Sequence, residues 1–192
     1  ARLDYTGHAR SGGGINTVAE REERVRRHRG TFHFQTFIGG FNTDEIGDFV
    51  ALTRENDLCV RFIELMPMGP CAAWPGHCFV PASTVLQAAP QLVPVGQDGV
   101  SQQYRVPGWR GSVGLISPMH HRFCGQCNRI RVLANGNLKP CLHAAAEYPL
   151  RGLPPDALRA AIAQAILQKP QQHTMDAYHA SRSCRNMHEI GG

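Results

Sequence analysis

Three cysteines in the second half of the chain have the spacing of metal ligands. Cys124 and Cys127 form a C-x-x-C pair, and Cys141 follows 14 positions after Cys127. A gap of two residues lets both thiolates of such a turn reach one metal centre. A structural zinc site would need a fourth ligand, whereas a four-iron cluster held by three thiolates would leave one iron open to substrate. Spacing leaves both metals open, and the histidines that could complete a zinc site are His120, His121 and His143.

A predicted β-hairpin explains how Cys141 returns to the C-x-x-C pair. Asn135-Gly136 strongly favours a two-residue turn, because both turn positions need positive φ. The strand-like residues on either side of this turn then pair so that Ile130 faces Cys141. We therefore expect Cys141 to lie next to Cys127.

Two arginines stand close to the predicted metal site. Arg129 and Arg131 are two positions apart, and residues with this spacing share one face of a strand. Paired guanidinium groups suit a polyphosphate ligand. A solvated strand face is the alternative interpretation of the same pattern.

The first third of the chain predicts alternating helices and strands. Residues 15–29 suggest a charged helix, and residues 31–38 a strand rich in β-branched and aromatic side chains. Asn42 and Glu45 resemble a capping box that begins a second helix. The nearly continuous apolar run at 58–66 is typical of a strand buried in a parallel sheet. This order predicts a parallel α/β fold or barrel.

The pattern changes in the remainder of the chain, where the cysteines lie. Residues 67–81 predict a long loop, 82–89 a short helix, 102–106 and 112–117 two short strands, and 155–168 a helix. The residues predicted to form the buried stripe of this last helix are Leu158, Ile162 and Ile166.

Composition narrows the class of protein. Hydrophobic residues make up 42% of 192 residues, enough for a core, and no run approaches the roughly 20 apolar residues of a membrane span. The net charge is +5, which suits nucleic acid, yet aromatic content is 7% and no nucleic-acid-binding motif occurs, so an acidic small molecule is at least as good a partner. Neither a nucleic-acid nor a membrane partner is expected. The beginning shows no signal peptide. Seven cysteines, an odd number, argue against a complete disulfide framework and favour a reducing, cytoplasmic location.

Four ordered segments resemble one enzyme family. The stretch FCGQCNRIRVLANGNLKPCL, residues 123–142, is similar to the C-terminal cluster motif of the GTP 3′,8-cyclases, radical-SAM enzymes that begin molybdenum-cofactor synthesis. VRFIELMPMG at 60–69 resembles the last barrel strand of this family, and GFNTDEIGDFV at 40–50 the loop and helix before it. The ending RNMHEIGG at 185–192 resembles the family's Gly-Gly tail.

The resemblance implies a cofactor set and a substrate. A C-terminal [4Fe-4S] cluster would sit on the three cysteines, and its open iron would bind the purine of GTP. S-adenosylmethionine would be the cofactor of the complete enzyme. The residues implied for GTP are Arg61, Arg129, Ile130 and Arg131, with Met66 at the S-adenosylmethionine site and Gly191 and Gly192 as a tail that reaches the active site.

The sequence also departs from this family. It contains no C-x-x-x-C-x-x-C motif for the S-adenosylmethionine cluster, and Cys71 and Cys78 have only its outer spacing. Phe32 stands near a position where the family has a basic GTP contact. We therefore expect residues 1–69 to be the last units of an incomplete (β/α) radical-SAM barrel, and residues 70–192 to form a small α+β cluster- and GTP-binding domain.

This chain by itself is then expected to be inactive. It would be a piece of a longer enzyme, completed by an N-terminal radical-SAM segment or acting as a homodimer, or a non-catalytic Fe–S nucleotide-binding paralogue. A small zinc-binding domain is the remaining alternative.

Overall fold

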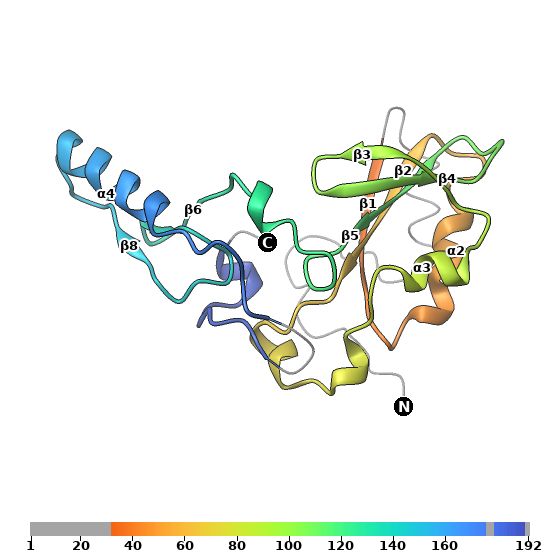
Figure 1. Ribbon diagram of the computed structural model, residues 1–192, viewed down its shortest axis with the longest axis horizontal. Coiled ribbons are helices and arrows are strands. Elements are labelled where there is room, and N and C mark those ends of the chain that lie inside the picture. The colour runs from red at the N-terminus through yellow and green to blue at the C-terminus, as the bar shows by residue number, and fades with distance from the viewer. Residues whose placement is uncertain (1–31, 176–178, 191–192) are drawn as a thin grey trace. The chain divides into compact units, whose positions relative to one another are not determined.

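The computed structural model describes residues 32–175 and 179–190, which form two units (Figure 1). The sheet unit comprises residues 32–65 and 78–117, and the cysteine unit comprises the described residues of 66–77 and 118–190. The helix predicted at 15–29 and the tail residues Gly191 and Gly192 lie outside the described residues. The predicted domain boundary after residue 69 stays a prediction.

The sheet unit is built on a mixed five-stranded sheet of order β1-β2-β5-β4-β3. The first three of these strands are parallel neighbours, and β4 pairs antiparallel with both β5 and β3. The chain is thus mixed α/β as predicted, and no barrel closes among the residues that the structure describes. The strands are β1 (Phe32–Ile38), β2 (Leu58–Glu64), β3 (Val93–Asp98), β4 (Ser101–Arg105) and β5 (Ser112–Ile116).

The predicted strands at 31–38, 58–66, 102–106 and 112–117 are confirmed, but β3 was not predicted. Its sequence VPVGQD contains a proline and a glycine, and every residue in it is exposed. Proline and glycine are tolerated in an edge strand, where one side of the backbone needs no ladder partner. Such a strand therefore lacks the apolar alternation that identifies strands in a sequence.

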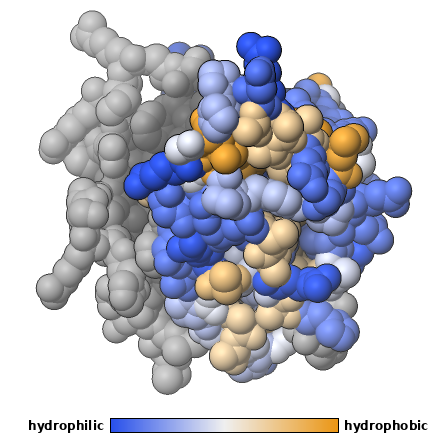
Figure 2. Space-filling model, turned by 90° about the vertical axis from the view of Figure 1, so that its left-hand side faces the viewer, coloured by the Kyte–Doolittle hydropathy of each residue, from blue (hydrophilic) through white to orange (hydrophobic). Residues whose placement is uncertain are grey.

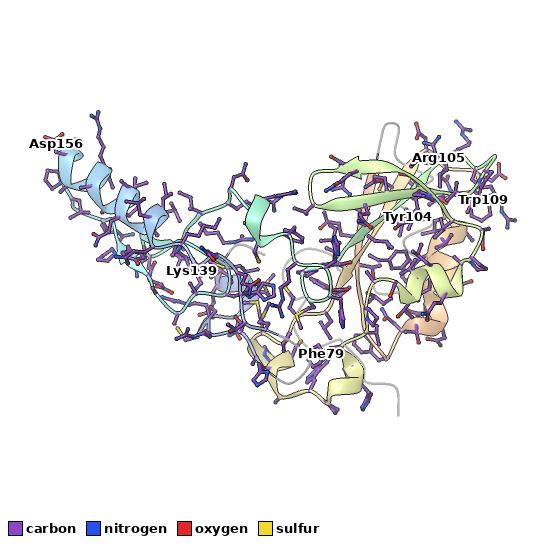
Figure 3. All side chains as sticks on the ribbon, in the orientation of Figure 1. Phe79, Tyr104, Arg105, Trp109, Lys139 and Asp156 are labelled. Atoms are coloured by element: carbon purple, nitrogen blue, oxygen red, sulfur yellow. The ribbon has the colours of Figure 1, made fainter. Side chains whose placement is uncertain are left out.

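Two helices cover an apolar core in the sheet unit. They are α2 (Ile46–Ala51), preceded by the 3₁₀ turn η1 (Thr43–Glu45), and α3 (Thr84–Ala88). Phe49 of α2 meets Phe62 of β2 edge to face, with ring centroids 6.1 Å apart. Tyr104 and Trp109, labelled in Figure 3, pack against the same core. Burial of this apolar surface is the main source of stability in the unit.

The predicted capping box is wrong. The Asn42 side chain accepts a hydrogen bond from the backbone N–H of Gly39 at 2.9 Å and donates to the carbonyl of Phe37 at 3.0 Å. It makes no capping bond to the helix that follows. The asparagine instead closes the turn after β1, a local side-chain contact that competes with capping.

The cysteine unit contains little regular structure. A three-stranded antiparallel sheet has the order β6-β7-β8, and the one α-helix described in this unit confirms the helix predicted at 155–168. No helix among the described residues is long and apolar enough to cross a membrane. The elements are η2 (Gly69–Ala73), η3 (Gly76–Cys78, ending at the first residue returned to the sheet unit), η4 (Cys124–Gln126), β6 (Arg131–Val132), β7 (Asn137–Lys139), β8 (Tyr148–Pro149), α4 (Pro155–Leu167) and η5 (Met187–Ile190).

The predicted hairpin forms, but its register differs by one residue. Arg131 pairs with Lys139, and the N–H of Leu133 donates to the carbonyl of Asn137 at 2.8 Å, which leaves three residues, 134–136, in the loop rather than two. The N–H of Gly136 donates to the carbonyl of Leu133 at 2.8 Å, and Gly136 has φ +87°. A turn followed by a left-handed glycine is the usual three-residue hairpin loop. The Asn-Gly pair therefore located the turn correctly and gave the wrong loop length.

The predicted stripe of α4 is also partly wrong. Leu158 and Ile162 are half-buried, but Ile166 is 49% exposed and Ala165 is fully buried in its place. The face of α4 that packs against the protein is therefore centred on Ala165 rather than on Ile166. Figure 2, which views the molecule from the side where α4 lies, shows apolar residues as separate patches among hydrophilic ones.

Candidate cluster and nucleotide site

The C-x-x-C pair forms a tight turn at the edge of an open pocket. Cys124 begins the 3₁₀ turn η4, and the N–H of Cys127 donates to the carbonyl of Cys124 at 3.1 Å. Both thiols are free and half-buried. The pocket has a volume of about 560 Å³ and is lined by Arg122, Cys124, Gly125, Cys127, Lys169, Pro170, Gln171 and Gln172. Two thiols in a basic pocket suit an anionic metal cluster.

A lysine that the sequence analysis did not select sits on this turn. The ammonium group of Lys169 donates to the carbonyl of Cys127 at 2.6 Å and to its Sγ at 3.4 Å. Burial of the Cys127 thiol raises its pKa, but hydrogen bonds from the backbone of Arg129 and from Lys169, with their charges, bring the pKa below its usual value. The thiolate is the form that binds metal, so this environment favours ligation.

The third predicted ligand, Cys141, is free and half-buried. It does not line the pocket of the other two cysteines. Within the described residues, no three side chains of the His, Cys, Asp or Glu type lie close enough together to hold a metal ion. The donor chemistry of the C-x-x-C turn fits a thiolate-bound cluster, and the role of Cys141 stays a prediction.

The predicted GTP-binding residues near the cysteines differ in their surroundings. Arg129 and Ile130 precede β6 and are exposed. Arg131 is half-buried and donates from Nη1 to the carbonyl of Ile190 at 3.0 Å. Ile190 directly precedes Gly191, so this contact attaches the described end of the tail to a predicted substrate residue.

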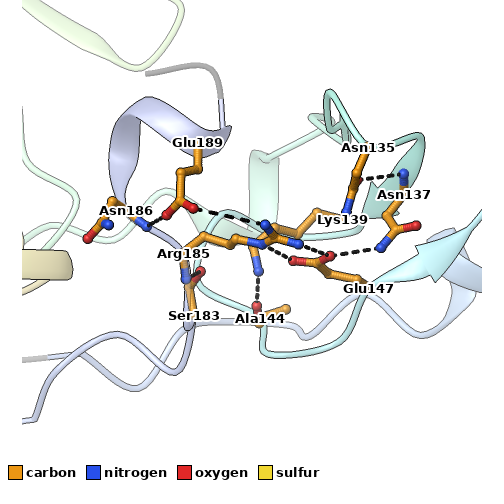
Figure 4. Close-up of polar contacts among 9 residues, drawn as sticks. All are labelled: Asn135, Asn137, Lys139, Ala144, Glu147, Ser183, Arg185, Asn186 and Glu189. Carbon is orange, nitrogen blue, oxygen red and sulfur yellow. Dashed lines mark hydrogen bonds and ion pairs between the residues drawn. The ribbon is translucent and has the colours of Figure 1, made fainter.

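An ion-pair network holds the tail in place (Figure 4). Arg185 donates to both carboxylate oxygens of Glu147, from Nε at 2.9 Å and from Nη2 at 3.0 Å. Asn137 of β7 adds a third hydrogen bond to Glu147 at 3.0 Å. The hydrogen bonds from Arg185 and then Asn137 lower the pKa of Glu147 to about 2. Glu189 accepts the backbone N–H of Asn186 at 2.6 Å, which closes the last turn.

The cysteine unit also buries one lysine and two histidines, Lys139, His143 and His173. Lys139, labelled in Figure 3, is fully buried and donates to the carbonyl of Ala144, and burial lowers its pKa. His143 and His173 meet edge to face, with ring centroids 5.0 Å apart. Burial first, and then the nearby His173, lower the pKa of His143 to about 4. His143 lies 3.2 Å from the hydroxyl of Ser181.

Arg61 lies on β2 in the sheet unit, beside Gly114 of β5. A Cβ at position 114 would lie 3.0 Å from Cγ of Arg61 and 2.4 Å from the hydroxyl of Ser101, so glycine makes room for the arginine. Arg61 forms an ion pair with Asp98, and its buried Nε has no hydrogen-bond partner among the described residues. Met66 belongs to the cysteine unit and packs against an apolar cluster that contains Met68, Met119, Leu133, Met175 and Ile190.

Sequence reasoning thus missed Lys169, Glu147 and Arg185. One signal was available for Lys169, because this arginine-rich chain contains only two lysines. The partnership of Glu147 with Arg185 joins residues 38 positions apart, which no local pattern reveals.

The chain is a mixed α/β protein in which two free thiols and two basic side chains, Arg122 and Lys169, line one pocket. These features place it among α/β proteins with a candidate metal site. Within that class, the chain belongs to the Molybdenum Cofactor Synthesis C family, whose profile matches residues 58–175, more than half of the chain. The resemblance stated from the sequence motifs is thereby confirmed.

Curated relatives agree with this assignment. The chain is 43% identical to GTP 3′,8-cyclase of Moorella thermoacetica over 164 residues. This alignment covers 80% of this chain and 50% of the relative. The chain is 42% and 40% identical over 160 residues to the GTP 3′,8-cyclases of Alkaliphilus metalliredigens and Alkaliphilus oremlandii, in each case over 81% of this chain and 50% of the relative. The chain therefore spans about half the length of the curated relatives it matches.

Proposed function

We propose that this chain is the cluster- and GTP-binding part of a GTP 3′,8-cyclase in molybdenum cofactor biosynthesis. The observation that carries the proposal is the thiol pocket of Cys124 and Cys127, which lies in the region similar to curated GTP 3′,8-cyclases. The location proposed for this activity is the cytoplasm.

The proposed cluster is a [4Fe-4S] cluster on Cys124, Cys127 and Cys141. When bound, it would supply an iron open to the purine of GTP. Assembly of the cluster would have to bring Cys141 to the other two thiols, because the described residues contain no group of three metal ligands. The free state of all three thiols supports this proposal.

The chain's own side chains would bind and orient the nucleotide. The guanidinium groups of Arg129 and Arg131 would bind the triphosphate, with Ile130 between them, and Arg61 would add a further cation. Fork-shaped guanidinium groups match phosphate oxygens in pairs. Gly191 and Gly192 would approach the substrate behind Ile190, which Arg131 holds by its carbonyl.

The proposed reaction also needs S-adenosylmethionine, with Met66 at its site. The sequence contains no C-x-x-x-C-x-x-C motif, so the cluster that cleaves S-adenosylmethionine would come from another, N-terminal radical-SAM segment. A homodimer, the other assembly proposed, would not supply this cluster, because the second copy lacks the motif as well. The same observation favours a second candidate, an Fe–S protein that binds the nucleotide without radical chemistry.

GTP binding tests the proposal. The chain is reconstituted anaerobically with iron and sulfide, and its affinities for GTP and ATP are measured by calorimetry. We expect GTP to bind more tightly than ATP, and Arg131→Ala to weaken GTP binding. A reconstituted chain that binds neither nucleotide would overturn the proposal. Turnover of GTP by this chain with S-adenosylmethionine and reductant would exclude the non-catalytic candidate.

A further inference from the structure

Lys169 joins the predicted metal site to the predicted nucleotide site. It lies two residues beyond the end of α4 at Leu167. Besides its two contacts with Cys127, its ammonium group donates to the carbonyl of Arg129 at 2.8 Å. A single side chain therefore contacts a predicted cluster ligand and the backbone of a predicted GTP residue.

The geometry of these contacts explains the choice of lysine. An ammonium group has three donors around one point, and Lys169 directs them to three acceptors in the segment from Cys127 to Arg129. A guanidinium group has a planar fork that matches a carboxylate or phosphate rather than three acceptors around a point. In a chain with 18 arginines, the lysine here is thus a specific fit.

The contact with the sulfur of Cys127 distinguishes Lys169 from a lysine that only donates hydrogen bonds to backbone carbonyls. Lys139, the other lysine, is fully buried and donates to the carbonyl of Ala144. Lys169 instead lines the open pocket together with both cysteines, and its charge lies 3.4 Å from Cys127 Sγ. Hydrogen bonds to ligand sulfurs set the reduction potential of iron–sulfur clusters, and outer-shell partners hold ligands in place.

We propose that Lys169 is a positioning residue that holds Cys127 for the cluster and fixes the backbone of Arg129 for the nucleotide. This inference rests on the proposed function. Removing the ammonium group frees the segment between the two residues and takes a positive charge away from the ligand sulfur. Both the lifetime and the potential of the cluster then change.

The test compares Lys169→Met with the native chain after anaerobic reconstitution. The matched control is Gln164→Met, which places the same side chain at an exposed position of α4 outside the pocket. Iron loss to a chelator is followed by absorbance, the reduction potential by redox titration, and GTP affinity by calorimetry. We expect Lys169→Met to lose iron about 10- to 100-fold faster. Its potential shifts to a more negative value and GTP binds more weakly, whereas Gln164→Met matches the native chain.

Native lifetime and native potential in a folded Lys169→Met variant would overturn the inference and leave the proposed function intact. A native chain that takes up no iron would overturn the proposed function, and the inference with it. If Lys169→Met does not fold, Lys169→Arg serves in its place. It keeps the charge but loses the three-acceptor geometry, so faster iron loss is still expected, and an unchanged lifetime would again contradict the inference.

Discussion

The two units of this chain are stabilised in different ways. In the sheet unit, apolar side chains from strands and helices form one core, with Val60, Phe62 and Val113 almost completely buried. In the cysteine unit, the apolar cluster is smaller, and polar side chains such as Glu147 and Lys169 connect segments that have no regular structure. Burial of apolar surface needs no particular partner, whereas a polar contact is lost when one partner is removed.

This difference suits the residues that each unit contributes to the proposed function. A unit held by a core presents a fixed surface, such as the strand that carries Arg61. A unit held by separate polar contacts leaves its thiols half-exposed and available to a ligand. Binding of a metal can then contribute to the folding of that unit.

The largest expected effect is in the core of the sheet unit. Phe62→Ala removes a ring that is 1% exposed and packs on Phe49. We expect a loss of about 3–5 kcal/mol in the free energy of unfolding, measured by urea denaturation with circular dichroism. Phe37→Ala, at a residue 42% exposed on the same sheet, is the control and costs much less. Equal losses in the two variants would contradict the assignment of stability to this core.

A smaller effect is expected for the polar network of the cysteine unit. Glu147→Gln weakens the paired hydrogen bonds from Arg185 and is expected to cost about 2 kcal/mol. The folded pKa of Glu147 is about 2, below its ordinary 4.5, so its contribution is present above pH 4.5 and disappears as the pH falls toward 2. The difference in stability between native chain and variant should shrink over this range. A difference that stays constant with pH would show that the charge of Glu147 does not stabilise the unit.

The smallest effect on stability is expected at the ion pair of Arg61. Asp98 is 63% exposed, so Asp98→Asn should change the free energy of unfolding by no more than about 1 kcal/mol. The same substitution frees a guanidinium group, and we expect tighter binding of inorganic tripolyphosphate, measured by calorimetry. Asp48→Asn, an exposed residue of α2, is the control for the change in net charge. Equal affinities in the two variants would mean that Asp98 does not compete for Arg61.

The sequence predicted the parts whose signals are local and periodic. The apolar run at β2 and the helix α4 were located correctly because burial and helical spacing are written into consecutive residues. The edge strand β3 was not predicted because its residues are exposed and show no apolar alternation. The predicted hairpin register was wrong because loop length depends on backbone geometry that Asn135-Gly136 does not determine. For the site, spacing singled out the C-x-x-C pair that lines the pocket, while the metal it would hold stays a prediction. The contacts of Lys169 could not, because they join residues 40 or more positions apart.

The central claim is that Cys124, Cys127 and Cys141 together hold an iron–sulfur cluster. The most direct measurement is the iron content and visible absorbance of the chain after anaerobic reconstitution with iron and sulfide. We predict about four irons per chain, lost in each Cys→Ser variant of these three residues and retained in Cys184→Ser, whose cysteine is exposed. Zinc, no metal, or iron that survives Cys141→Ser would contradict the claim.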